Sequence, residues 1–194
     1  MRGVGAAELL LVVALTLIGL AVAVPSLAYV RDEGRAAAAA RQMAATFSSL
    51  RYRSVTHGKA AGLLFQRQGA GWAWWEVEDG NGNGLRTSEV ERGVDRIRSG
   101  PHRLEDRVQG VRLGFPPLAS IPEIPPGSDT IADLDDPVQF GRSDLVSFTP
   151  QGSASSGTLY LSDGRGVLYG VVLYGATCRV RVWRFDTYRR RWTL

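Results

Sequence analysis

The sequence predicts an α+β protein in which a long, partly transmembrane N-terminal helix packs on antiparallel β-sheet. Three observations support this prediction. Residues from Leu9 to Val30 carry no charge, residues 31–57 keep helical periodicity, and the rest of the chain falls into short strand-like runs. With 194 residues and one cysteine, the chain is long enough to bury a core but can form no intramolecular disulfide.

The N-terminal apolar run is long enough to cross a bilayer, which takes about 20 apolar residues. Pro25 lies within it and should kink the helix, because proline lacks a backbone donor. Glu8 is a carboxylate at the head of the run, where burial in hydrocarbon would cost at least ~2.5 kcal/mol. Glu8 therefore either has a function within the membrane or simply lies in the headgroup region.

Residues 31–57 continue the helix beyond the membrane. Alanines, which are strong helix formers, fill positions 36–40. Met43, Phe47 and Leu50 recur at spacings of four and three, so they form one apolar stripe that we expect to pack on the remainder of the chain. Gly58 is the expected end of the helix.

The remainder of the chain contains strand-like runs bounded by Gly, Pro, Ser, Asp or Asn. The expected strands are Ala61–Gln66, Trp72–Glu78, Val111–Phe115, Leu145–Thr149, Thr158–Ser162, Val167–Tyr174 and Arg179–Phe185. No helical pattern of any length separates them, so the sheet should be mainly antiparallel. Residues 116–142 are rich in proline and acidic side chains, and we expect them to form a long, poorly ordered loop.

One segment resembles half of a calcium loop. Asp79, Asn81 and Asn83 have the alternating spacing of its first ligands, but the twelfth position is Val90, which Glu89 and Glu91 flank. A tight turn without metal is the expectation; weak calcium binding through Asp79, Asn81, Asn83 and Glu89 is the alternative. We expect no other metal and no cofactor.

The N-terminus also resembles the class III signal of type IV pilins and type II secretion pseudopilins. A short basic leader ends at Gly3, and Glu8 and the apolar run follow. The resemblance implies that a prepilin peptidase cuts between Gly3 and Val4 and methylates Val4. It also implies that Glu8, the fifth mature residue, pairs with the terminal amine of a neighbouring subunit during assembly, and that Pro25 is a typical feature of the assembly helix.

A second resemblance extends over the C-terminal half. The runs Phe148-Thr149-Pro150-Gln151-Gly152, Gly157-Thr158-Leu159 and Arg179-Val180-Arg181-Val182 follow the order of the GspH/FimT family of minor pseudopilins. Cys178 stands where that family usually has a glycine. Together, the two resemblances imply a pilin-like fold and a structural, non-enzymatic role as a subunit of a type II secretion pseudopilus or a type IV pilus.

The resemblance implies a domain order, a location and partners. The expected parts are a leader at 1–3, a transmembrane or filament-core helix at 4–30, an amphipathic helix at 31–57 and a β-rich pseudopilin domain at 58–194. The expected location is the bacterial inner membrane, single-pass, with the globular domain on the periplasmic side or within a pilus. The expected partners are the prepilin peptidase, other pseudopilins or pilins, and the inner membrane.

Two alternatives stay open. The C-terminal tail is basic, and some FimT-like minor pilins bind DNA through such a region, so DNA uptake is one alternative. The arginines that would contact DNA are Arg179, Arg181, Arg184, Arg189, Arg190 and Arg191. The other alternative is an exported β-rich domain whose apolar segment is an ordinary signal or anchor. No signature of an enzyme is present in the sequence.

Overall fold

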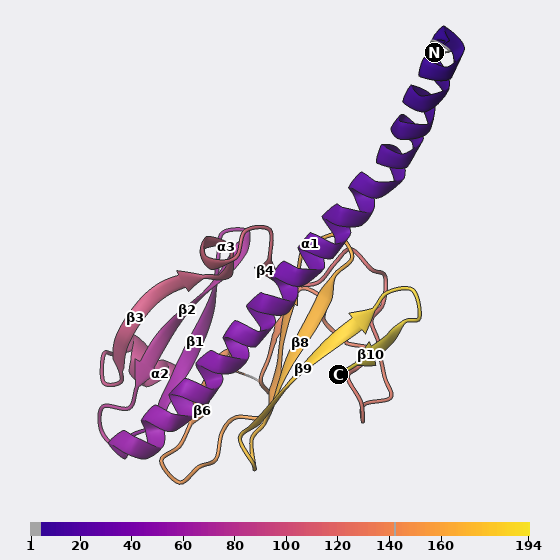
Figure 1. Cartoon of the computed structure of the whole chain (residues 1–194). Coiled ribbons are helices and arrows are strands. Elements are labelled where there is room, and N and C mark those ends of the chain that lie inside the picture. Colours follow the sequence, from indigo (N-terminus) through magenta and orange to yellow (C-terminus); the bar gives the residue numbers. More distant parts are fainter. Residues whose placement is uncertain (1–4, 142) are drawn as a thin grey trace.

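A single long helix lies across two antiparallel sheets in the computed structural model of the chain (Figure 1). The structure describes residues 5–141 and 143–194, and the side chains of residues 20–30 are not among those described. The N-terminal part of the helix extends away from both sheets, and its C-terminal part covers them.

The helix α1 spans Ala6–His57 and ends where Gly58 adopts a left-handed conformation, with φ of 64°. This confirms the predicted end, since glycine has no Cβ to oppose that conformation. The predicted stripe is also confirmed, because Met43, Phe47 and Leu50 are fully buried together with alanines of the preceding turns. The small alanines allow the helix to approach the strands closely.

The first sheet has the strand order β3-β2-β1-β6 and the second has the order β10-β9-β8-β7-β4, with β5 also pairing with β7. All pairings are antiparallel. The first sheet is built from β1 (Ala61–Gln68), β2 (Gly71–Glu78), β3 (Arg96–Arg103) and β6 (Leu145–Phe148). The second is built from β4 (Arg112–Leu113), β5 (Val138–Gln139), β7 (Gly157–Ser162), β8 (Leu168–Tyr174), β9 (Arg179–Asp186) and β10 (Arg191–Thr193).

The strand side chains alternate between two faces, and each face has its own core. The inner faces of both sheets and α1 form one shared core, which includes Phe65, Trp74 and Val171. The outer face of the first sheet packs on the segment after β2, which contains the short helix α2 (Thr87–Glu91). The outer face of the second sheet packs on the loop that follows β4.

Six of the predicted strands overlap observed strands of at least four residues, whereas the predicted strand Val111–Phe115 is reduced to the two residues of β4. The sequence interpretation missed β3, β5, β10 and the short helices α2 and α3 (Leu104–Arg107). The strand β3 was missed because its side chains are mostly exposed and three of its eight residues are arginine, so it shows no apolar alternation. It lies at the edge of the sheet, where one face need not be buried.

The expectation of a poorly ordered loop at residues 116–142 is wrong for the part that the structure describes. Ile121 is fully buried and Ile131 nearly so, and both pack against Tyr160 and Leu168 of the second sheet. Backbone bonds between Ile131 and Ile121 and between Glu123 and Asp129 close the loop on itself. The apolar residues spaced through the acidic segment therefore hold it against the sheet.

The fold class and the localisation predicted from the N-terminus are also wrong. Among residues 5–141 and 143–194, we find no helix with an apolar stretch long enough to cross a membrane. The structure is that of a mixed α/β protein rich in β-strand, with two antiparallel sheets. The predicted single-pass inner-membrane location is not supported.

Candidate functional site

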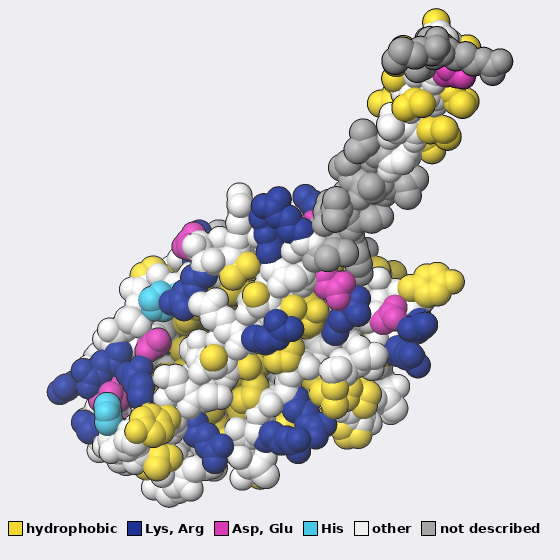
Figure 2. Space-filling view, in the orientation of Figure 1, with side chains coloured by type: hydrophobic (Ala, Val, Ile, Leu, Met, Phe, Trp, Pro, Cys, Tyr) yellow, Lys and Arg dark blue, Asp and Glu magenta, His cyan; other side chains and the backbone are white. Residues whose placement is uncertain are grey.

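The N-terminal part of α1 is the most apolar exposed surface in the described chain. Figure 2 shows hydrophobic side chains gathered near the end of the projecting part of the molecule, clear of its body. They are 48–70% exposed, and they occupy all sides of the helix rather than one stripe. The residues are Leu9, Leu10, Leu11, Val12, Val13, Leu15, Leu17 and Ile18. We call this set the apolar segment. An exposed apolar surface of this size is typical of an interaction site.

Glu8 lies at the start of α1, one residue before the apolar segment. One oxygen of its carboxylate accepts a hydrogen bond from the backbone N–H of Gly5 at 3.1 Å. A carboxylate there also faces the positive end of the helix dipole, which stabilises it by about 0.3–1 kcal/mol. Glu8 therefore has a local capping role, and its pairing with a neighbouring amine stays a prediction.

Two residues of the predicted processing site, Gly3 and Val4, lie outside the described residues. Pro25 lies within α1, in the stretch whose side chains are not described, and its predicted kink stays a prediction. Of the four residues, only Glu8 has a described environment.

Acidic side chains fasten α1 to the second sheet where the helix meets the body of the protein. Glu33 forms an ion pair with Arg184 of β9, with 2.9 Å between Oε1 of Glu33 and Nε of Arg184. Asp32 is paired with Arg165 at 3.2 Å and with Arg35 at 3.7 Å. These contacts mark the boundary between the buried part of the helix and its projecting part.

The basic tail is divided between the two faces of the second sheet. Val180 and Val182 pack in the shared core, so Arg184, which has the same parity, faces α1. Arg179 and Arg181 face outward with Trp183 and Phe185. Arg184 therefore lies on the opposite face of β9 from Arg179 and Arg181, so these predicted DNA contacts do not share one side of the strand.

The three arginines of the last turn differ in their contacts. Arg190 donates to the carbonyl and hydroxyl oxygens of Ser120 at 2.9 and 2.8 Å, and so ties the turn to the loop. Arg189 is paired with Asp186 at 3.7 Å. Arg191 is exposed at the start of β10. The six tail arginines therefore do not form a single surface for nucleic acid.

The candidate calcium turn satisfies its own polar groups. One oxygen of Asp79 accepts the backbone N–H groups of Asn81 and Gly82, and the other accepts that of Gly84. The side-chain amides of Asn81 and Asn83 donate to Glu89 at 3.4 and 3.1 Å. Among the residues that the structure describes, no cluster of His, Cys, Asp or Glu could hold a metal ion.

Asp95 is the residue of this turn that the sequence interpretation missed. It is 1% exposed, and its carboxylate accepts the N–H groups of Gly80 and Arg86, both at 3.1 Å. Asp95 lies sixteen positions after Asp79, too far along the chain for local spacing to identify it. Asp79 is also buried, which raises its pKa, but the backbone N–H bonds outweigh burial and leave the pKa below its usual range.

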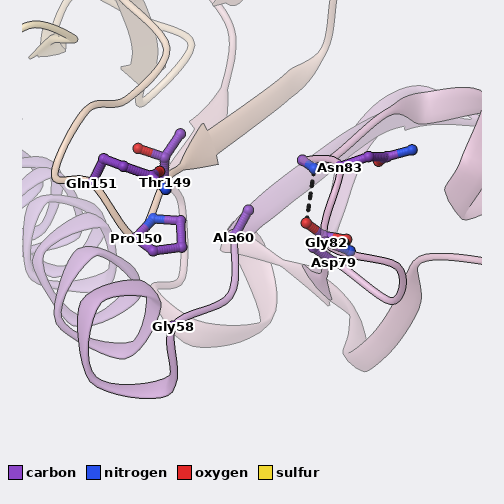
Figure 3. A pocket seen from close by; sticks show the side chains of 9 residues that line it. Gly58, Ala60, Asp79, Gly82, Asn83, Thr149, Pro150 and Gln151 are labelled. Atoms are coloured by element: carbon purple, nitrogen blue, oxygen red, sulfur yellow. Dashed lines mark hydrogen bonds between the residues drawn. The ribbon is translucent and has the colours of Figure 1, made fainter.

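A polar pocket of about 330 Å³ lies beside this turn (Figure 3). It is bounded by the end of α1 at Gly58, by Asp79 and its turn, and by Thr149 to Gln151 after β6. The carboxylate of Asp79 is engaged by backbone donors, so the pocket shows no free charged group of its own.

Cys178 is buried at the hairpin between β8 and β9. Its thiol donates to the carbonyl oxygen of Gly152 at 3.0 Å, and burial raises its pKa. These properties make it a poor nucleophile.

Comparison with known proteins adds no relative: no family model, curated protein or solved structure matches the chain.

Proposed function

We propose that the chain is a minor pseudopilin, a structural subunit that joins a type II secretion pseudopilus or a type IV pilus through the N-terminal part of α1. The observation that carries the proposal is the apolar segment, which projects from the body of the protein with its side chains exposed. Packing those side chains against equivalent helices of other subunits would remove them from water, at about 25 cal/mol per Å² of apolar surface.

The two parts of α1 have different roles in this proposal. Buried residues between Ala36 and Leu50 pack in the shared core and hold the helix to both sheets. The apolar segment makes no contribution to that core, so it is free to bind other subunits. In this proposal the chain has no catalytic role, and its partners are a prepilin peptidase and other pseudopilins or pilins.

Processing of the N-terminus tests the proposal. The full chain is co-expressed with a prepilin peptidase, and the intact mass of the product is measured. We expect loss of residues 1–3 and the gain of one methyl group on Val4. Gly3→Ala should block both changes. The matched control is Gly19→Ala, because a Cβ at Gly19 meets no neighbouring atom within 4 Å and the residue is remote from the cut.

Either of two results would contradict the proposal. Normal processing of Gly3→Ala, or a product that begins near Ala23, would remove the pseudopilin assignment. A cut near Ala23 would instead support an ordinary exported β-rich domain. For DNA uptake, the division of the arginines between two faces leaves no observation that favours it.

A further inference from the structure

The outer face of the second sheet is only partly covered by the loop. Tyr160, Leu168 and Phe185 lie beneath it. Beyond the covered part, one row of paired residues crosses four strands: Gln139 of β5, Thr158 of β7, Val172 of β8 and Arg181 of β9. Each is half-buried and has core-facing neighbours in its own strand, so the row faces outward.

The surface along this row is hollowed. A depression of about 310 Å³ includes Gln139, Thr158, Val172 and Tyr174 in its lining. A second depression, of about 520 Å³, is bordered by Tyr174, Arg179 and Arg181. Tyr174 belongs to both, so the two depressions adjoin along the row. The face therefore offers a continuous indented surface with an aromatic ring at its middle.

Positive charge gathers at the β9 end of the row. Arg179 is exposed and Arg181 is half-buried. Neither guanidinium forms an ion pair with any residue that the structure describes, whereas Arg184 on the opposite face is paired with Glu33. These two charges are therefore available to a partner.

Negative charge gathers at the β5 end. The side-chain amide of Gln139 donates to the backbone oxygens of Asp133 and Asp136, at 3.1 and 3.2 Å, and so fixes that part of the loop beside β5. Asp133 and Asp135 are exposed. Within the described ranges, none of the loop's carboxylates is in an ion pair.

The two ends cannot neutralise each other within one chain. They are separated by three strand spacings, or about 14 Å at 4.7–4.9 Å per spacing. The acids at the β5 end also repel one another. The pKa of Asp136 is raised by burial and, to a lesser extent, by the charge of Asp133. The pKa of Asp144 is raised by burial and, to a lesser extent, by the charge of Asp136. Both ends thus have charge that an external partner of opposite sign would stabilise.

We propose that two copies of this chain associate face to face through the outer face of the second sheet, with the acidic loop of each copy against Arg179 and Arg181 of the other. A two-fold axis parallel to the strands places the β5 end of one row over the β9 end of the other. The contact is then isologous, with both charge pairs made twice. This inference goes beyond the proposed function and does not rest on it.

A second copy suits this surface better than other partners. An acidic peptide would neutralise the arginines but leave the carboxylates at the β5 end unpaired. A nucleic acid lying along the row would be repelled by those same carboxylates. Only a partner with both signs of charge, in reversed order, matches both ends, and the chain itself has that order.

Charge reversal tests the proposal. The full chain is studied by sedimentation velocity at low salt, in a non-ionic detergent that covers the apolar segment. We expect self-association that weakens as salt rises, because exposed charges are screened. Arg181→Glu and Asp135→Arg should each weaken it about tenfold, since every reversal acts at two symmetric contacts. An equimolar mixture of the two variants should restore association, because both contacts are attractive in the mixed pair.

Two controls have the same charge changes elsewhere on the exposed surface: Arg191→Glu and Glu91→Arg. They should associate like the unaltered chain. The proposal is overturned if the unaltered chain stays monomeric at low salt, if the controls weaken association as much as the test variants, or if the mixture does not restore it.

Discussion

Phe47 is where α1 and both sheets meet, and replacing it with alanine should cost the protein a large part of its stability. The ring is fully buried. It contacts Phe140 edge-on with centroids 6.2 Å apart, and Phe148 at 6.0 Å. Phe148 belongs to β6 of the first sheet, and Phe140 follows β5 of the second. The ring thus joins three parts of the shared core.

The expected loss for Phe47→Ala is about 4 kcal/mol in the free energy of unfolding. Removal of a buried phenylalanine side chain costs roughly 3–5 kcal/mol, from lost transfer energy and the cavity left behind. Two aromatic pairs are lost with the ring, at about 0.5–1.5 kcal/mol each, so we expect a loss above the lower end of that range. Phe47→Leu keeps most of the volume and should lose about half as much.

Urea unfolding of the full chain measures this loss, with tryptophan fluorescence and circular dichroism as independent probes. Trp74 lies in the same core and reports on it. The control is Ser48→Ala on the exposed side of α1, which should change stability by less than about 0.5 kcal/mol. A loss below about 1 kcal/mol for Phe47→Ala, or separate transitions for the two probes, would refute the claim that α1 unites both sheets in one core.

Three further predictions follow from particular contacts. Trp192→Phe removes an indole bond of 2.7 Å to the carbonyl of Pro122; it should cost about 1 kcal/mol and speed proteolysis within residues 116–142. Asp79→Asn should destabilise the protein by roughly 1–3 kcal/mol at neutral pH. The folded-state pKa of Asp79 is depressed, so the stability that its carboxylate contributes is present above its unfolded-state pKa and is lost as pH falls through its folded-state pKa. Urea titrations should therefore show the difference in unfolding free energy between the two proteins shrinking below about pH 4. Cys178 is buried with a raised pKa, so iodoacetamide should label it at a rate set by unfolding, and fast labelling of the folded chain would contradict its placement.

Where apolar side chains recur at a regular spacing, the sequence was sufficient to predict the structure. The stripe of Met43, Phe47 and Leu50 and the glycine at residue 58 predicted the packing and the end of α1, because burial and left-handed backbone depend on local residue types. The edge strand β3 escaped prediction because its exposed charged side chains carry no burial pattern.

The errors in the loop and the tail have one cause, which is that average composition was given more weight than individual side chains. The acidic loop contains Ile121 and Ile131, whose burial against the sheet outweighs the charge around them. In β9, strict alternation places Arg184 opposite to Arg181, and Trp183 fits that alternation as an outward residue. The acid that closes the turn at Asp79 lies sixteen positions later in the chain, so local spacing could not identify Asp95.

The central claim is that the chain assembles through the apolar segment, and a cross-link from within that segment tests it most directly. A photoreactive amino acid replaces Leu11 in the full chain, which is expressed with candidate pseudopilin partners and irradiated. The claim predicts covalent adducts to the N-terminal helices of those partners, and none when the same probe replaces Tyr188, which is 95% exposed on the turn before β10. Absence of adducts at Leu11, or equal adducts from both positions, would contradict it.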